Sequence, residues 1–237
     1  MDIHENKIES VSQYIAMMER GPSEFYRGQS QDWPLLPSLS RISHGHIPDL
    51  SVLELDILRE FKRLSLPYFE NVPKGNAEWV IHAQHYGLPT RLLDWTSNPL
   101  KALYFAVENL DEDNDGVVWS IDPFNIEYEI NEPNLSTSQH YFFRPSHLNL
   151  RITSQESYFL VFPLEEGETM LKPLNELFLE QSQRGEYGMV EKMTIPKELK
   201  SDFKATLDGL GINKLSIYPG LEGVVESVKD YFAIKNA

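Results

Sequence analysis

Two uninterrupted apolar segments of strand length constrain the fold of this chain most. They are Gly116–Ile121, with the sequence GVVWSI, and Ser157–Phe162, with the sequence SYFLVF. A short continuous apolar run is typical of a strand that is covered on both faces. The two segments therefore predict the interior of a sheet with helices packed against it.

Helical patterns account for much of the remaining chain. Apolar residues recur at helical spacing in the segments 6–20, 51–66, 76–86, 98–107, 198–210 and 221–233. A capping box, Ser51–Glu54, is expected to open the second of these, and Gly87 with Pro89 beyond it to end the third. Asn98 and Pro99 provide a cap and a first helical residue for the fourth.

The remaining segments complete a prediction of the fold class. Further strands are expected at 24–29, 187–194 and 214–218, and the polar segment 122–150 is expected to be a long loop near the site. The 237 residues contain no internal repeat and no convincing linker. We therefore expect one α+β domain over residues 1–237, with a small central mixed sheet flanked by helices.

The charge balance and the cysteine count limit the classes of partner and compartment. A formal net charge of −15 opposes broad contact with phosphate backbones or anionic lipid, although it leaves room for a small recognition site. The absence of cysteine excludes disulfides, thiolate nucleophiles and Cys-ligated zinc. With a polar opening segment and no apolar run near the length of a membrane span, a cytoplasmic protein without membrane contact is expected.

The densest group of chemically active side chains lies at residues 84–99, QHYGLPTRLLDWTSNP. The helix expected to open at Pro99 presents free backbone N–H groups, and Arg91, Thr96 and Ser97 could add donors around a phosphate. The alternative is architectural, because Arg91 could instead pair with Asp94 beside a capped turn. The sequence leaves both interpretations open.

Metal binding is not expected. The segment 111–122 begins like a calcium loop, but its twelfth residue is Asp where Glu is usual. His82 and His85 share a helix face but lack a third ligand at motif spacing. His44 and His46 lie in a segment that contains Gly and Pro and is expected to be a loop.

The order of motifs along the chain resembles that of the FRG domain family, which is named for its aromatic-Arg-Gly motif and occurs in bacteria and their phages. The similar segments are FYRGQ at 25–29, QHYGLPTRLLDWT at 84–96, NP at 98–99, ALYFA at 102–106, RITSQESYF at 151–159 and a closing segment at 211–223. Ser157 stands where the family pattern usually has Gly. The resemblance covers roughly residues 8–232, which implies one FRG-like core of that extent.

The same layout is similar to that of ADP-ribosyltransferase-like domains. This resemblance implies that Arg27 holds the ribose and phosphates of NAD, that Thr96 orients the nicotinamide ribose, and that Gln155 or Glu156 acts on the acceptor. Gln155 is a neutral amide, which can orient a hydroxyl but cannot act as a general base. Glu156 is ionisable, but as the strand neighbour of Gln155 it is expected to face the other way.

These motifs supply the candidate site residues. The candidate catalytic residues are Arg27, Thr96, Gln155 and Glu156, and the candidate ligand-binding residues are Arg27, Gln29, Gln84, His85, Tyr86, Arg91 and Asp94. We expect Arg27 and the 84–96 segment to converge on one cleft, since strand ends and helix ends present polar side chains to ligands.

The expected function is NAD-dependent ADP-ribosyl transfer or NAD cleavage, with NAD as the substrate and with a role in phage–host conflict. The ligand would be a nucleotide-like small molecule, and the acceptor a protein or a nucleic acid. The alternative is a non-catalytic binding or sensor module that uses the same polar cleft.

Overall fold

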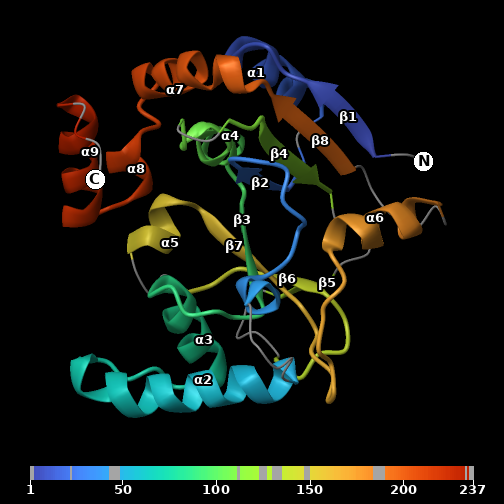
Figure 1. The fold of residues 1–237 in the computed structure, drawn as a ribbon, viewed down its shortest axis with the longest axis vertical. Helices are drawn as coiled ribbons and strands as arrows, with labels where there is room; N and C mark the ends of the chain where they lie inside the picture. The colour runs from blue at the N-terminus through green and yellow to red at the C-terminus, as the bar shows by residue number, and fades with distance from the viewer. Residues whose placement is uncertain are drawn as a thin grey trace.

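The centre of the molecule is a mixed sheet of eight strands in the order β1-β8-β4-β2-β3-β7-β6-β5 (Figure 1). The computed structural model describes residues 3–21, 23–42, 49–110, 113–122, 127–129, 135–146, 150–183, 190–232 and 234. The strands are β1 (His4–Lys7), β2 (Phe25–Gln29), β3 (Leu92–Thr96), β4 (Gly116–Ile121), β5 (Glu127–Glu129), β6 (Tyr141–Phe143), β7 (Ser157–Val161) and β8 (Val190–Ile195). Strand β1 runs parallel to β8 and β5 parallel to β6, while the other neighbours are antiparallel. The α+β class with a central mixed sheet is confirmed.

Helices cover both faces of this sheet. They are α1 (Val11–Arg20), α2 (Leu50–Ser65), α3 (Asn76–His85), α4 (Pro99–Val107), α5 (Leu150–Ser154), α6 (Leu174–Gln183), α7 (Lys200–Gly209), α8 (Lys214–Ile217) and α9 (Leu221–Tyr231), with short 3-10 turns at Ser38–Arg41, Leu66–Tyr68 and Lys197–Leu199. Helices α1 and α7 lie at one end of the molecule, and α2 and α3 lie at the other (Figure 1). In the described part of the chain, no helix combines the length and apolar character that crossing a membrane requires.

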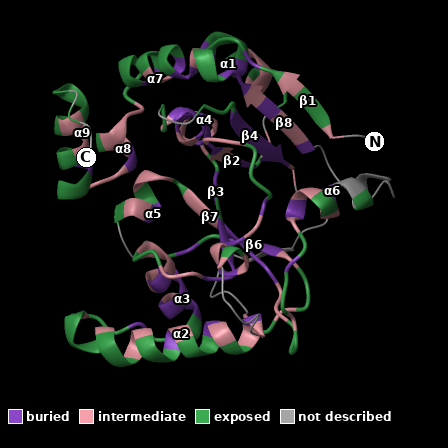
Figure 2. Ribbon diagram, in the orientation of Figure 1, coloured by how far each residue is buried: buried purple, intermediate pink, exposed green. Residues whose placement is uncertain are grey.

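Two clusters of buried apolar side chains pack on opposite faces of the sheet. Helices α1, α4, α7 and α8 contribute to one cluster, and α2, α3 and α6 to the other. Strand β4 serves both, because Val118 belongs to the first cluster while Val117 and Trp119 belong to the second. All residues of β4 are buried, as the continuous apolar segment predicts, and Figure 2 shows the sheet as the buried centre of the fold.

The glycine of the aromatic-Arg-Gly motif lets α4 lie directly on the sheet. A Cβ added to Gly28 of β2 would stand 1.8 Å from the carbonyl oxygen of Ala102, and one added to Gly116 of β4 would stand 2.3 Å from that of Ala106. Any side chain at these positions would push the helix away from the strands. The motif therefore fixes the distance between β2, which carries Arg27, and the helix beside it.

Two predicted helix starts are wrong. Residues 4–7 form β1 beside β8, and α1 begins only at Val11, where the Ser10 side chain accepts a hydrogen bond from the Gln13 N–H. Helix α2 is capped by Asp49, whose carboxylate accepts hydrogen bonds from the N–H groups of Ser51 and Val52. The expected Ser51–Glu54 capping box does not form, because the Glu54 side chain is buried and bound elsewhere.

The segments 214–218 and 122–150 also differ from expectation. The predicted strand at 214–218 is the short helix α8, because Asn213 and Ser216 form a reciprocal capping box. The expected long loop at 122–150 contains β5 and β6, while residues 123–126, 130–134 and 147–149 lie outside the described residues. Helices α5 and α6 were not predicted, since neither carries a long apolar stripe.

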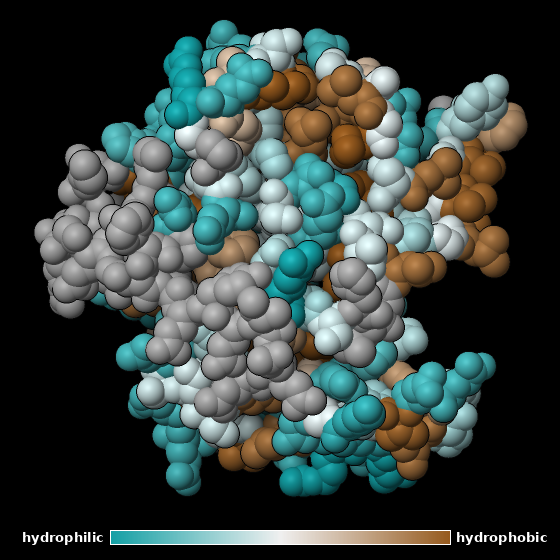
Figure 3. All heavy atoms as spheres, turned by 180° about the vertical axis from the view of Figure 1, so that it is seen from behind, coloured by the Kyte–Doolittle hydropathy of each residue, from teal (hydrophilic) through white to brown (hydrophobic). Residues whose placement is uncertain are grey.

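The last predicted helix forms, but its apolar stripe does not face the core. Gly223 is the buried residue of α9, where an added Cβ would stand 1.9 Å from the carbonyl oxygen of Tyr218. The stripe is exposed, and it consists of Leu221, Val224, Val225, Val228 and Phe232. Figure 3 shows apolar side chains gathered along this edge of the molecule.

Candidate functional site

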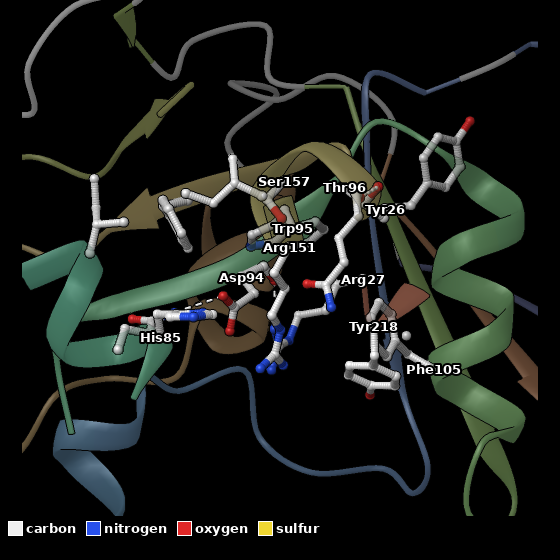
Figure 4. Close-up of a pocket in the computed structure, with 16 residues that line it drawn as sticks. Tyr26, Arg27, His85, Asp94, Trp95, Thr96, Phe105, Arg151, Ser157 and Tyr218 are labelled. Atoms are coloured by element: carbon white, nitrogen blue, oxygen red, sulfur yellow. Dashed lines mark hydrogen bonds between the residues drawn. The ribbon is translucent and has the colours of Figure 1, made fainter. Parts of the chain in front are cut away.

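A cavity of about 300 Å³ lies between β2, β3, α3, α4, α5 and the turn after α8 (Figure 4). Its lining residues are Tyr26, Arg27, Gly28, Ile81, Gln84, His85, Asp94, Trp95, Thr96, Phe105, Arg151, Ile152, Gln155, Ser157, Phe159 and Tyr218. The structure thus brings together six candidate residues from distant parts of the sequence, namely Arg27, Gln84, His85, Asp94, Thr96 and Gln155. In Figure 4, His85 and Asp94 lie on one side of the cavity, and Phe105 and Tyr218 on the other.

Asp94 is held at the cavity by a short chain of hydrogen bonds. Nε2 of Gln84 donates to Oδ1 of Asp94 at 2.7 Å, and the hydroxyl of Thr90 donates to Oε1 of Gln84. Gln84 is on the last turn of α3 and Asp94 is in the middle of β3, so the bond fastens a helix end to the sheet. Asp94 and Thr96 are two residues apart in β3 and therefore share one face of the strand.

Arg27 reaches the same place from β2. Its Nη1 donates to the backbone carbonyl oxygen of Asp94 at 2.5 Å, and its Nε donates to Oε1 of Gln29 at 3.3 Å. Burial lowers the pKa of Arg27 to about 10, against the opposing effect of the Asp94 charge. Arg27 therefore stays protonated at neutral pH and gives the cavity a fixed positive charge.

A second arginine and an aromatic wall complete the cavity. The guanidinium carbon of Arg151, on α5, lies 5.3 Å from the ring centroid of Tyr218, and the Tyr218 hydroxyl donates to Oε2 of Glu108 at 2.9 Å. The ring of Phe105 meets that of Tyr218 edge to face, with centroids 6.4 Å apart. Arg151 and Tyr218 were missed as site residues, although Arg151 opens the RITSQ motif and Tyr218 precedes a Pro-Gly turn.

His85 adds a neutral ring to the cavity. Burial, together with the nearby charge of Arg151, lowers the pKa of His85 below its ordinary value of 6.5, while Glu222 opposes the shift. The imidazole is therefore uncharged at neutral pH, and at that pH the two arginines supply the positive charge of the lining.

Thr96 and Gln155 line the cavity but are engaged with each other. The Thr96 hydroxyl donates to the backbone carbonyl oxygen of Gln155 at 2.7 Å and accepts from the N–H of Asn98 at 3.0 Å. The Gln155 amide donates to the carbonyl oxygen of Ile217 at 3.4 Å. These contacts join β3, the start of α4 and the turn before β7, so they shape the cavity wall.

Part of the chain is similar to a known protein family. Residues 23–115 match the model of the FRG domain, and this range holds Arg27, Gln84, His85, Asp94 and Thr96. The chain contains an FRG domain. No curated protein and no solved structure matches the chain. Arg151, Gln155 and Tyr218 lie beyond the matched range, so the cavity is built from the FRG match together with later segments.

Arg91, a predicted ligand-binding residue of the FRG motif, is not at the cavity. Its Nη2 lies 2.6 Å from Oε2 of Glu54 in a buried ion pair, and its Nη1 donates to the carbonyl oxygen of Leu135 at 2.8 Å. Both alternatives weighed from the sequence are corrected, because Arg91 contacts neither the cavity nor Asp94. Its role is to join α2 to the start of β3.

Two further predicted binding residues also lie away from the cavity. Gln29 is buried, and its amide donates to the carbonyl oxygen of Trp33 at 2.9 Å while its Oε1 accepts from Arg27. Tyr86 is exposed because α3 ends just before it and Gly87 turns the chain with a φ of 84°. Gln29 therefore holds the Arg27 side chain through a hydrogen bond, and Tyr86 faces solvent.

Glu156, a predicted catalytic residue, is not among the residues that line the cavity. It lies in the turn between α5 and β7 with a φ of 49°, and not in a strand as expected. Its Oε1 accepts from Lys101 at 2.7 Å and from the Asn98 amide at 2.9 Å. The hydrogen bonds from Lys101 and Asn98 lower the pKa of Glu156, although burial opposes them. Glu156 thus ties the turn to the start of α4.

The described residues include no group of three or more His, Asp or Glu side chains that could hold a metal ion. His44, His46 and the first two residues of the calcium-like segment lie outside the described residues.

Proposed function

We propose that the cavity binds NAD or a related nucleotide and that the protein transfers or cleaves its ADP-ribosyl group. The observation that carries this proposal is the pair of arginines, Arg27 and Arg151, that line one cavity in a chain of net charge −15. Among the described residues, no acidic side chain forms an ion pair with either of them. Guanidinium groups that lack a carboxylate partner are suited to phosphate.

The size and the walls of the cavity support a nucleotide. A volume of about 300 Å³ is at the lower end of the range for small-molecule sites, so the cavity would take one nucleotide half of NAD. The rings of Phe105 and Tyr218 offer an aromatic surface beside the charged groups. In this arrangement the second half of the dinucleotide would lie at the mouth.

Calorimetric titration with a ligand series tests the proposal. NAD and ADP-ribose should bind, whereas nicotinamide riboside, which lacks phosphate, should bind at least about tenfold more weakly. Arg151→Gln should weaken binding of NAD, and Arg59→Gln, which removes an exposed arginine from α2, should not. Equal affinity for the three ligands would contradict a phosphate site.

A binding or sensor module without turnover is the second candidate. The observation in its favour is Glu156, the expected acceptor-activating carboxylate, whose side chain binds Lys101 and Asn98 outside the cavity. Mixing pure protein with NAD separates the two candidates, because an enzyme releases nicotinamide and a sensor binds without product. For both candidates we propose a cytoplasmic protein with a role in phage–host conflict. If the protein is a transferase, we propose that a protein or a nucleic acid accepts the ADP-ribosyl group.

A further inference from the structure

We infer that Asp94 is the carboxylate that acts at the reacting centre and that Thr90 and Gln84 position it. This inference rests on the proposed function and assigns a step that Glu156 cannot perform from its place outside the cavity. Asp94 is the sole carboxylate among the described residues that line the cavity. Asp94 is also exposed, so water can reach its carboxylate.

The hydrogen bonds around Gln84 fix the direction of its amide. The Thr90 hydroxyl accepts from the backbone N–H of Leu92 at 3.2 Å and donates its own proton to Gln84. An amide that accepts at Oε1 from Thr90 must point its NH₂ group at Asp94. Thr90 is 1% exposed, so this series of hydrogen bonds starts from a buried hydroxyl.

The hydrogen bond from the Gln84 amide occupies one carboxylate oxygen of Asp94 and leaves the other available. Oδ1 of Asp94 accepts from Gln84, and no described residue donates to Oδ2. The backbone carbonyl of the same residue accepts from Arg27, so the strand is fixed at this point by a group that would also contact the ligand. The geometry is that of a positioned base with a free oxygen, held between α3 and β2.

Water is the second reactant in the proposed cleavage of NAD. Asp94 takes a proton from a water molecule, and the water oxygen forms a bond to C1′ of the nicotinamide ribose. The C1′–N bond breaks, its electron pair goes to the pyridinium ring, and nicotinamide leaves as a neutral molecule. ADP-ribose and one proton are the other products. An acceptor hydroxyl in place of water turns the same step into transfer.

Three variants test the reacting group, with NAD as the probe. Asp94→Asn should lower nicotinamide release by about 100-fold or more and leave the calorimetric affinity for NAD within about threefold. Asp56→Asn makes the same chemical change at an exposed aspartate on α2 and should leave release unchanged. Full release by Asp94→Asn, or loss of release by Glu156→Gln alone, would overturn the assignment.

A second set of variants tests the hydrogen bonds that run from Thr90 through Gln84 to Asp94. Thr90→Val removes the hydroxyl and should lower kcat about tenfold with little change in KM, while Thr90→Ser should restore kcat. A purely structural threonine would lower the melting temperature of Thr90→Val without changing kcat of the folded enzyme. If wild-type protein does not bind NAD, or binds NAD without releasing nicotinamide, the proposed enzymatic function fails. If wild type releases nicotinamide and Asp94→Asn releases it equally fast, the inference alone fails.

Discussion

Arg91 and Glu54 form an ion pair in the interior, with Nη2 of the arginine 2.6 Å from Oε2 of the glutamate. The Arg91 backbone N–H also donates to Oε1 of Glu54 at 3.0 Å, and its Nε donates to Oε2 at 2.6 Å. Both side chains are buried, at 6% and 1% residue exposure. The pair joins α2 to the start of β3, and neither residue lines the cavity.

Arg91→Met should lower the free energy of unfolding by about 3–5 kcal/mol, because it leaves the Glu54 carboxylate buried without its partner. The Arg91→Met, Glu54→Leu double variant should recover much of this loss, since no charge then remains in the interior. Denaturant unfolding measures both effects. Weaker NAD binding by an Arg91→Met protein of unchanged stability would instead place Arg91 at the ligand.

The pairing of Arg91 with Glu54 could not be predicted from the sequence. Glu54 is 37 positions earlier in the chain, and only the packing of α2 on the sheet brings it to Arg91. Asp94 is much nearer in the sequence, so spacing favoured it. The strands at Gly116–Ile121 and Ser157–Val161 were predictable because their apolar runs are continuous. Residues 214–218 were not, because the alternation of Leu215 and Ile217 in so short a segment imitates a strand.

Gly28→Ala should lower the free energy of unfolding by about 1–3 kcal/mol, because the new Cβ would meet the Ala102 carbonyl oxygen at 1.8 Å and force α4 away from β2. Gly209→Ala is the matched control. Nothing lies within 4 Å of a Cβ at that position, on the last turn of α7, so stability should rise by about 0.5–1 kcal/mol. Equal effects of the two substitutions in thermal unfolding would disprove the close packing.

His140 should make the protein sensitive to mild acid. Burial, against the ring of Phe162 at 4.7 Å, lowers the pKa of His140 to about 4, whereas the unfolded value is about 6.5. The unfolded state therefore binds the extra proton first as pH falls. The contribution of neutral His140 to the free energy of unfolding is fully present above about pH 6.5. It decreases by about 1.4 kcal/mol per pH unit as the pH falls to about 4.

Comparison of wild type with His140→Leu measures this contribution. The variant should lose less stability than wild type between pH 6.5 and 4, by about 3 kcal/mol in total. His4→Gln, which replaces an exposed histidine, should follow the wild-type curve. Parallel curves for wild type and His140→Leu would show that His140 titrates normally in the folded protein.

Calorimetric titration of NAD into wild type and Arg27→Lys, with the melting temperature of each, tests whether Arg27 binds a phosphate of NAD. Lysine keeps the charge but lacks the planar fork of donors that fits a phosphate. We predict that wild type binds NAD and that Arg27→Lys binds at least about tenfold more weakly at a nearly unchanged melting temperature. Unchanged affinity in an intact Arg27→Lys protein, or no binding of NAD by wild type, would contradict this prediction.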